Sequence, residues 1–153
     1  ADIDKPLIAA GGIGNGRGML GALALGADGV QVGSRFAASE ESSAHINFKQ
    51  RVVESKEGDT ILALKALTPV RLIKNDFYNQ VKQAEQRGAA VEELKSILGK
   101  RRSKKGIFEG DLSEGELEIG QISASINDIM PAAQILKDIW SEYTKLKDNF
   151  CKM

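Results

Sequence analysis

PLIAAGG (residues 6–12) and GVQVGS (residues 29–34) decide the fold that we predict for this chain. Each is a short apolar run that ends in small residues, a pattern typical of a strand buried on both faces of a parallel sheet. Between them, Asn15 can cap the start of a helix, and Gly26 can end that helix in a left-handed conformation. Residues 6–36 therefore predict a β-α-β unit whose two strands are parallel neighbours.

The ends of these two strands offer backbone N–H groups to a ligand. Gly11 and Gly12 follow the first strand, and Gly33 and Ser34 follow the second. Glycine lets a ligand approach the backbone because it has no Cβ, and oriented amides suit a phosphate. A tight turn would explain one such pair, but two pairs at successive parallel strands favour binding. We therefore expect these four residues, together with the Ser34 hydroxyl, to hold a phosphate.

An ordered set of motifs resembles the nitronate monooxygenase family, formerly called 2-nitropropane dioxygenases, which includes the FMN-dependent enoyl-ACP reductase II. The motifs are AAGGI (9–13), GADGVQVGSRF (26–36), ESSAH (41–45), VRLIKN (70–75) and GDLSEGELEIGQI (110–122). The resemblance implies that the two strands are the last two of a (β/α)8 TIM barrel and that their ends clasp the phosphate of FMN.

The length of the chain sets the expected domain organisation. A complete barrel of this kind needs roughly 200 to 250 residues, whereas the chain has 153. We therefore expect an α/β fold that is the C-terminal part of a TIM barrel, with the missing N-terminal part as its partner. Residues 1–57 are predicted to form the last βαβα of the FMN-binding barrel. Residues 58–153 are predicted to form a mostly helical extension that packs on it.

The segments after the second strand are predicted to be mainly helical. A helix is expected from about residue 42 to residue 55, whereas residues 60–67 leave a strand and an irregular segment open. Further helices are expected to end at Gly88 and Gly99, and Pro131 is expected to open the last one. The predicted buried stripe of the first of these helices is Ile46, Phe48, Val52 and Val53, and the apolar face of the last is Ile135, Leu136, Ile139, Trp140 and Tyr143.

Composition and charge argue against several classes of function. The chain has 21 basic and 21 acidic residues, so no net charge favours nucleic acid or an anionic membrane. No apolar stretch is long enough to span a bilayer, and no Cys/His cluster suggests a metal. The single cysteine, Cys151, is expected to be a free thiol in a cytoplasmic protein. The basic run 100–105 is expected to be a solvated loop or helix end, with an acidic carrier protein as the alternative partner.

The resemblance also implies roles for individual residues. Gln31 would lie close to the flavin. Gly120 and Gln121 match a motif that approaches the active-site side, although a turn before a helix would explain them equally well. The catalytic histidine of the family lies upstream of AAGGI, so we assign no catalytic residue in this chain. His45 is expected to start or pack a helix. Arg35 could bind the phosphate or as easily pair with an acid on a neighbouring helix, so we do not assign it to the site.

Two reactions and one non-catalytic alternative are open. The resemblance implies an FMN-dependent oxidoreductase that oxidises a nitronate with O2. The alternative is an enoyl-ACP reductase II that uses NAD(P)H as co-substrate and acyl-ACP as substrate. The chain alone could also be a fragment that carries only a phosphate-binding half-site. A homo-oligomer is possible in each case.

Overall fold

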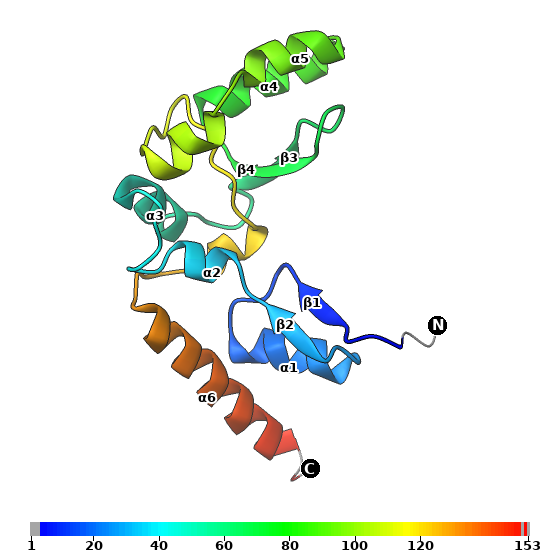
Figure 1. Cartoon of the computed structure of the whole chain (residues 1–153), viewed down its shortest axis with the longest axis vertical. Coiled ribbons are helices and arrows are strands. Elements are labelled where there is room, and N and C mark those ends of the chain that lie inside the picture. Colours follow the sequence, from blue (N-terminus) through cyan, green and yellow to red (C-terminus); the bar gives the residue numbers. More distant parts are fainter. Residues whose placement is uncertain (1–3, 151, 153) are drawn as a thin grey trace.

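The structure, a computed structural model, describes residues 4–150 and 152. Cys151, for which the sequence predicts a free thiol, lies outside the described residues. The fold is α/β, as predicted, and Figure 1 shows a long, curved molecule. Its elements are β1 (Ile8–Ala10), α1 (Gly16–Ala24), β2 (Gly29–Gln31), α2 (Ser34–Ala37), α3 (Ile46–Val53), β3 (Thr60–Ala63), β4 (Val70–Ile73), α4 (Asp76–Gln86), α5 (Val91–Leu98), the single π-helical turn η1 (Lys104–Phe108), the 3-10 helix η2 (Gln121–Ser125) and α6 (Ala132–Phe150).

The predicted β-α-β unit is confirmed. Strands β1 and β2 pair in parallel, with Ala9 opposite Val30. The side chain of Asn15 caps α1 by accepting a hydrogen bond from the backbone N–H of Gly18 at 2.8 Å. Helix α1 ends before Gly26, whose φ of 98° lies in the left-handed region. Local capping signals therefore placed this unit correctly.

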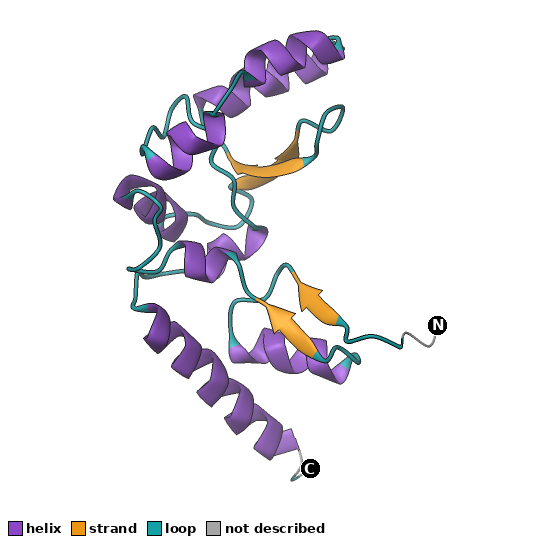
Figure 2. Cartoon of the chain, in the orientation of Figure 1, coloured by secondary structure: helices purple, strands orange, loops and turns teal. Residues whose placement is uncertain are grey.

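The prediction that these strands are buried on both faces is wrong for this structure. Leu7 is 46% exposed and Ile8 is 53% exposed. Within residues 4–150, β1 and β2 form a sheet of two strands with no further strand beside them. Figure 2 shows this small sheet with α1 next to it. The apolar side chains of β1 are exposed because only part of the sheet is covered.

Helix α3 starts later than predicted. It begins at Ile46 instead of about residue 42, because His45 is its cap: the Nδ1 atom of His45 accepts a hydrogen bond from the Asn47 N–H at 3.1 Å. Phe48 and Val52 are buried as predicted, whereas Ile46 is 50% exposed. The histidine therefore has the helix-start role that the sequence suggested.

The middle of the chain contains a β-hairpin. Residues 60–67, which the sequence left open, begin with β3, and β3 pairs with β4 in an antiparallel sheet. Helices α4 and α5 follow and end near Gly88 and Gly99, both of which have positive φ. The segment after η1 runs along the other side of β4, where the Ile73 N–H donates to the Leu117 carbonyl and the Ile119 N–H donates to the Arg71 carbonyl. Beyond residue 57 the chain thus combines helices with this hairpin and with irregular segments.

Helix α6 starts after Pro131, as predicted, but only part of its expected apolar face is covered. Ile135 and Ile139 are buried, whereas Leu136 is 62% exposed and Trp140 is 59% exposed. The expected apolar face is therefore only partly buried, and Trp140 lies on its exposed part. Helix α6 packs against α1, and α1 covers only part of the apolar face that the periodicity of α6 indicates.

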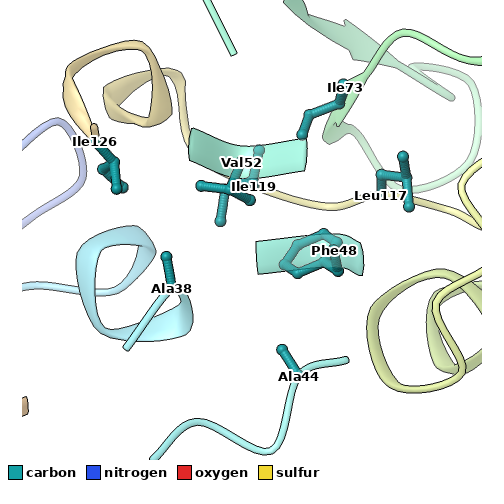
Figure 3. Packing of buried hydrophobic residues seen from close by; sticks show 8 residues of the cluster. All are labelled: Ala38, Ala44, Phe48, Val52, Ile73, Leu117, Ile119 and Ile126. Carbon is teal, nitrogen blue, oxygen red and sulfur yellow. The ribbon is translucent and has the colours of Figure 1, made fainter. Parts of the chain in front are cut away.

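Two hydrophobic clusters hold the middle and upper parts of Figure 1 together. Figure 3 shows the first, in which α3 packs against the turn after α2 and the segments that flank η2. The second joins the hairpin to α4. Basic residues of the run 100–105 form ion pairs with acids of the same region, Arg102 with Glu114 and Lys105 with Asp111. With Lys104, which pairs with Glu109, three of the five basic residues of the run are therefore neutralised locally.

Candidate functional site

The residues predicted to hold a phosphate line one pocket. Gly11 and Gly12 follow β1, and Gln31, Gly33 and Ser34 come from the end of β2 and the start of α2. The pocket has a volume of about 270 Å³. Its complete lining is Ala10, Gly11, Gly12, Ile13, Gln31, Gly33, Ser34, Gly120 and Ile122.

The glycines of this pocket leave space and unused donors. Gly11 and Gly12 have φ values of 86° and 71°, a conformation that L side chains rarely adopt. A Cβ atom added at Gly11, Gly12 or Gly33 would meet no atom within 4 Å. The backbone N–H groups of Gly12, Gly33 and Ser34 donate to no other group in the part of the chain that the structure describes. The pocket therefore has open space beside free hydrogen-bond donors.

Gly120 joins this pocket from a distant part of the sequence. Its N–H donates to the hydroxyl oxygen of Ser34 at 3.1 Å. A Cβ at Gly120 would lie 2.7 Å from that oxygen, so only glycine fits there without a shift. Because Ser34 Oγ accepts this bond, the hydroxyl proton remains available to donate. The strand-like segment beside β4 positions Gly120, since it ends one residue earlier at Ile119.

Gln121 lies beside a second, larger pocket instead. This pocket has a volume of about 600 Å³ and shares Gly12 and Ile122 with the first. Ile122 lines both pockets. A Cβ at Gly14 would lie 3.0 Å from Ile122 Cγ1, so η2 packs directly on the glycine loop. The structure thus places Gly120 with the predicted phosphate ligands and Gln121 next to them.

Sequence reasoning missed several residues of the two pockets. Ile122 was not singled out, although it is the last residue of the quoted motif 110–122. Arg71, Thr60 and Lys56 line the larger pocket. Arg71 is part of the motif VRLIKN, so its signal was present in the sequence, whereas Thr60 and Lys56 carried no such signal.

His45 and Arg35 do not line either pocket. The His45 ring lies against Gly110, where an added Cβ would come within 2.2 Å of Nδ1. The Arg35 guanidinium pairs with the Asp128 carboxylate and donates to the Asp128 carbonyl at 3.0 Å. That acid lies in the segment before α6, so of the two roles that the sequence left open for Arg35 the structure shows the ion pair, with a loop residue as its partner. Both residues are structural.

The most strongly shifted carboxyl group of the described residues is also remote from the pockets. Glu116 is 5% exposed, and its pKa is raised to about 7, with burial as the largest cause. The charge of Glu118 and a hydrogen bond to Glu118 contribute to this rise of the Glu116 pKa, and the charge of Arg102 opposes it. Because Glu116 lines neither pocket, its titration bears on stability.

Within the described residues, no three His, Cys, Asp or Glu side chains gather in a group that could hold a metal ion. The same residues contain no helix that combines the length and the apolar character needed to cross a bilayer.

Comparison with known proteins identifies the relatives of the chain. A probable nitronate monooxygenase from Bacillus subtilis is 33% identical over 145 residues, which are 94% of this chain and 42% of that protein. The structure of FabK from Thermotoga maritima superposes with a TM-score of 0.90 at 34% identity, covering 98% of this chain and 48% of that one. A nitroalkane oxidase from Streptomyces ansochromogenes gives a TM-score of 0.74 at 28% identity, and the match covers 97% of this chain and 42% of that one.

The chain spans less than half the length of each of these three relatives. The family model for nitronate monooxygenase matches residues 2–142. Since that match extends over most of the sequence, the chain belongs to the nitronate monooxygenase family.

Proposed function

We propose that this chain supplies the FMN-phosphate-binding part of a flavin-dependent oxidoreductase that oxidises nitronates. The observation that carries the proposal is the meeting of two parallel strand ends and Gly120 around one pocket with unused N–H donors. Membership of the nitronate monooxygenase family supports the class of reaction.

The residues of the pocket fit a phosphate. The N–H groups of Gly12, Gly33 and Ser34 would donate to its oxygens, and the Ser34 hydroxyl would add one more donor. Such backbone cradles bind phosphate without a cationic side chain, because several oriented N–H dipoles share the negative charge. The space in front of the glycines is where the oxygens would lie.

We further propose that β1 and β2 are the last two strands of a TIM barrel. The exposed apolar side chains of Leu7 and Ile8 fit strands that lack covering neighbours. The length of the relatives supports a preceding part of the barrel as the partner of this chain. The catalytic base would then come from that part, so this chain binds and orients the cofactor.

When bound, FMN would supply the redox chemistry by taking electrons from the substrate and passing them on. This chain's own residues would anchor the phosphate end of the cofactor. Gln31 lines the same pocket from the end of β2, and its amide can donate and accept hydrogen bonds there. Gln31 therefore serves to orient the bound cofactor.

A second candidate function is an NAD(P)H- and FMN-dependent enoyl-ACP reductase II. The similarity to FabK over 98% of the chain favours it. The two functions differ in their substrates, so they are separated by a direct assay of the flavin-loaded full-length protein. O2 consumption with an alkyl nitronate would support the first function, and NAD(P)H oxidation with an enoyl thioester would support the second. A homo-oligomer stays a prediction in both cases.

The phosphate cradle is tested with Gly33→Val. Gly33 has a φ of −102°, so valine adds bulk in front of the cradle without left-handed strain. We expect this variant of the full-length protein to keep its circular dichroism spectrum and to lose FMN on desalting, measured by visible absorbance. Gly12→Val is a weaker test, because its φ of 71° would also strain the backbone.

Gly21→Ala is the matched control, because Gly21 lies in α1 and lines neither pocket. Unchanged FMN affinity in Gly33→Val would overturn the assigned phosphate site. Should the protein of this sequence by itself take up no FMN, the half-site alternative would hold for the isolated chain.

A further inference from the structure

The second pocket, next to the phosphate cradle, contains an arginine that pairs with no acid among residues 4–150. Arg71 lies on β4 and is half-buried, and its Nη1 atom donates to the carbonyl and hydroxyl oxygens of Thr60 at 3.3 and 3.2 Å. No carboxylate oxygen of the described residues lies within 4.0 Å of its guanidinium nitrogens. A guanidinium has five N–H donors, so most of its donors lack an acceptor.

Other half-buried arginines of the chain are compensated. Arg35 pairs with Asp128, and Arg102 pairs with Glu114 at 2.9 Å. Removing a cation from water costs free energy unless an opposite charge or hydrogen bonds replace the water. Arg71 therefore differs from its counterparts in being partly desolvated without an anion.

The rest of the pocket is also suited to an anion. Lys56 lines it, and no acidic oxygen among residues 4–150 lies within 4.0 Å of its amino group. The acids here are Glu57 in the lining and Asp59 on the same loop, whose carboxylate accepts from the Lys56 N–H at 3.0 Å. Lys74 donates to the carbonyl of Gly58, a lining residue, at 2.7 Å, so a third cation stands near the rim. Three cations, Arg71, Lys56 and Lys74, therefore stand against these two acids, and the balance of charge around the pocket is positive by one.

The position of the pocket relates it to the cofactor site. It shares Gly12 and Ile122 with the phosphate cradle, and its volume of about 600 Å³ is within the range of small-molecule sites. A molecule bound there would lie beside a cofactor held by the cradle.

We propose that this pocket binds the oxyanionic group of a molecule that reacts with the bound flavin, and that Arg71 is the main ligand of that group. The inference rests on the proposed function. A planar guanidinium binds two oxygens of one group at once, which suits a nitronate, a carboxylate or a phosphate. The oxyanion can be that of a small nitronate or the phosphate of a larger co-substrate, and the choice of probe separates these sources.

The test measures binding to the flavin-loaded full-length protein by calorimetry, with two probes. Isobutyrate stands for a small nitronate, because its carboxylate has the same planar shape, and NADP⁺ stands for a phosphate-bearing co-substrate. The variants are Arg71→Met, which keeps most of the side-chain volume, and Arg71→Lys, which keeps the charge without the fork. Lys82→Met on α4 is the control, because Lys82 is exposed and lines neither pocket.

We expect at least one probe to bind the wild-type protein and to bind Arg71→Met about tenfold or more weakly, as for the loss of a charge-assisted hydrogen bond. Arg71→Lys should recover part of the affinity, and Lys82→Met should bind like the wild type. Lys56→Gln, on an exposed loop, should weaken the same probe by a smaller factor and keeps the test valid if Arg71→Met does not fold.

Two results overturn the inference: no binding of either probe to the wild type, or equal binding to the wild type and to Arg71→Met and Lys56→Gln. FMN retention is measured in the same samples by visible absorbance. Loss of FMN from the wild type would contradict the proposed function, whereas FMN retention without probe binding would contradict only the role of Arg71.

Discussion

The contact between α1 and α6 depends on a glycine, and Gly16→Ala should break it. Gly16 is the first residue of α1, and its N–H donates to the Glu142 carboxylate at 2.7 Å. A Cβ at Gly16 would lie 2.3 Å from the Tyr143 nitrogen and 2.5 Å from the Ile139 carbonyl oxygen. Ordinary contact begins at 3.4 Å, so α6 would have to move by about 1 Å. Neither atom can rotate away, because both belong to the backbone of α6.

The size of the effect follows from this clash. Overpacking a close-packed contact typically costs about 1–3 kcal/mol, and the movement would also weaken a hydrogen bond to a charged group, which is worth about 1.5–3 kcal/mol. These terms overlap, so we expect a loss of about 3 kcal/mol of unfolding free energy. For a protein of this size, that corresponds to a fall in Tm of roughly 6–12 °C.

Gly21→Ala is the matched control on the same helix. A Cβ at Gly21 would meet nothing within 4 Å, and the residue is exposed. Alanine has a higher helix propensity than glycine, so this variant should gain about 1 kcal/mol of unfolding free energy, and its Tm should rise by roughly 2–4 °C. Thermal unfolding followed by circular dichroism measures both. If Gly16→Ala unfolds within about 1 °C of Gly21→Ala, the packing of α1 on α6 is not as described.

Three further predictions concern other parts of the chain. Gly120→Ala should weaken FMN binding about tenfold, because the added Cβ would lie 2.7 Å from the Ser34 hydroxyl oxygen and would push that hydroxyl away. An unchanged FMN titration would contradict this. His45→Ala should lower the free energy of unfolding by about 1 kcal/mol, because it removes the acceptor for the Asn47 N–H. His45→Asp should restore this stability, since aspartate can accept the same hydrogen bond. Equal urea midpoints for the two variants would disprove the capping role. The raised pKa of Glu116 favours its protonated form in the folded state, so stability should fall as pH rises from about 4.5, the ordinary value, to about 7. Glu116→Gln should remove this slope, and an unchanged slope in urea titrations would argue against it.

The sequence predicted the parts of the fold that depend on local signals. Asn15 and Gly26 define both ends of α1, and Gly88 and Gly99 mark the ends of α4 and α5. Such positions need a particular side-chain acceptor or a positive φ, which few residue types provide. The start of α3 was missed because several residues from 39 to 43 could cap a helix, whereas the residue that does so is a histidine.

The burial of other residues depends on which element packs against them, and the periodicity of apolar residues in the sequence does not identify that element. Trp140 belongs to the apolar face of α6 but is 59% exposed, because α1 covers only part of that face. Leu7 and Ile8 read as buried strand residues, although their burial requires neighbours that residues 4–150 do not provide. Gly120 lies beside Ser34 because the segment before Gly120 runs along β4. The two residues are 86 positions apart in the sequence. The motif resemblance suggested that Gly120 approaches the active-site side. Local reasoning alone could not distinguish this role from a simple turn before a helix.

The glycines illustrate why the site itself needed the structure. Gly16 and Gly120 are glycines because an added Cβ would collide with the backbone of α6 or with Ser34. Gly12 and Gly33 have nothing within 4 Å of that position, and the same is true of the exposed Gly21. Open space alone therefore does not mark a binding site. The cradle differs because its open positions come from two neighbouring strand ends, and because N–H donors without acceptors accompany them. A ligand with several acceptor oxygens would satisfy both conditions together, which is why a phosphate fits this pocket and not the exposed surface of α1.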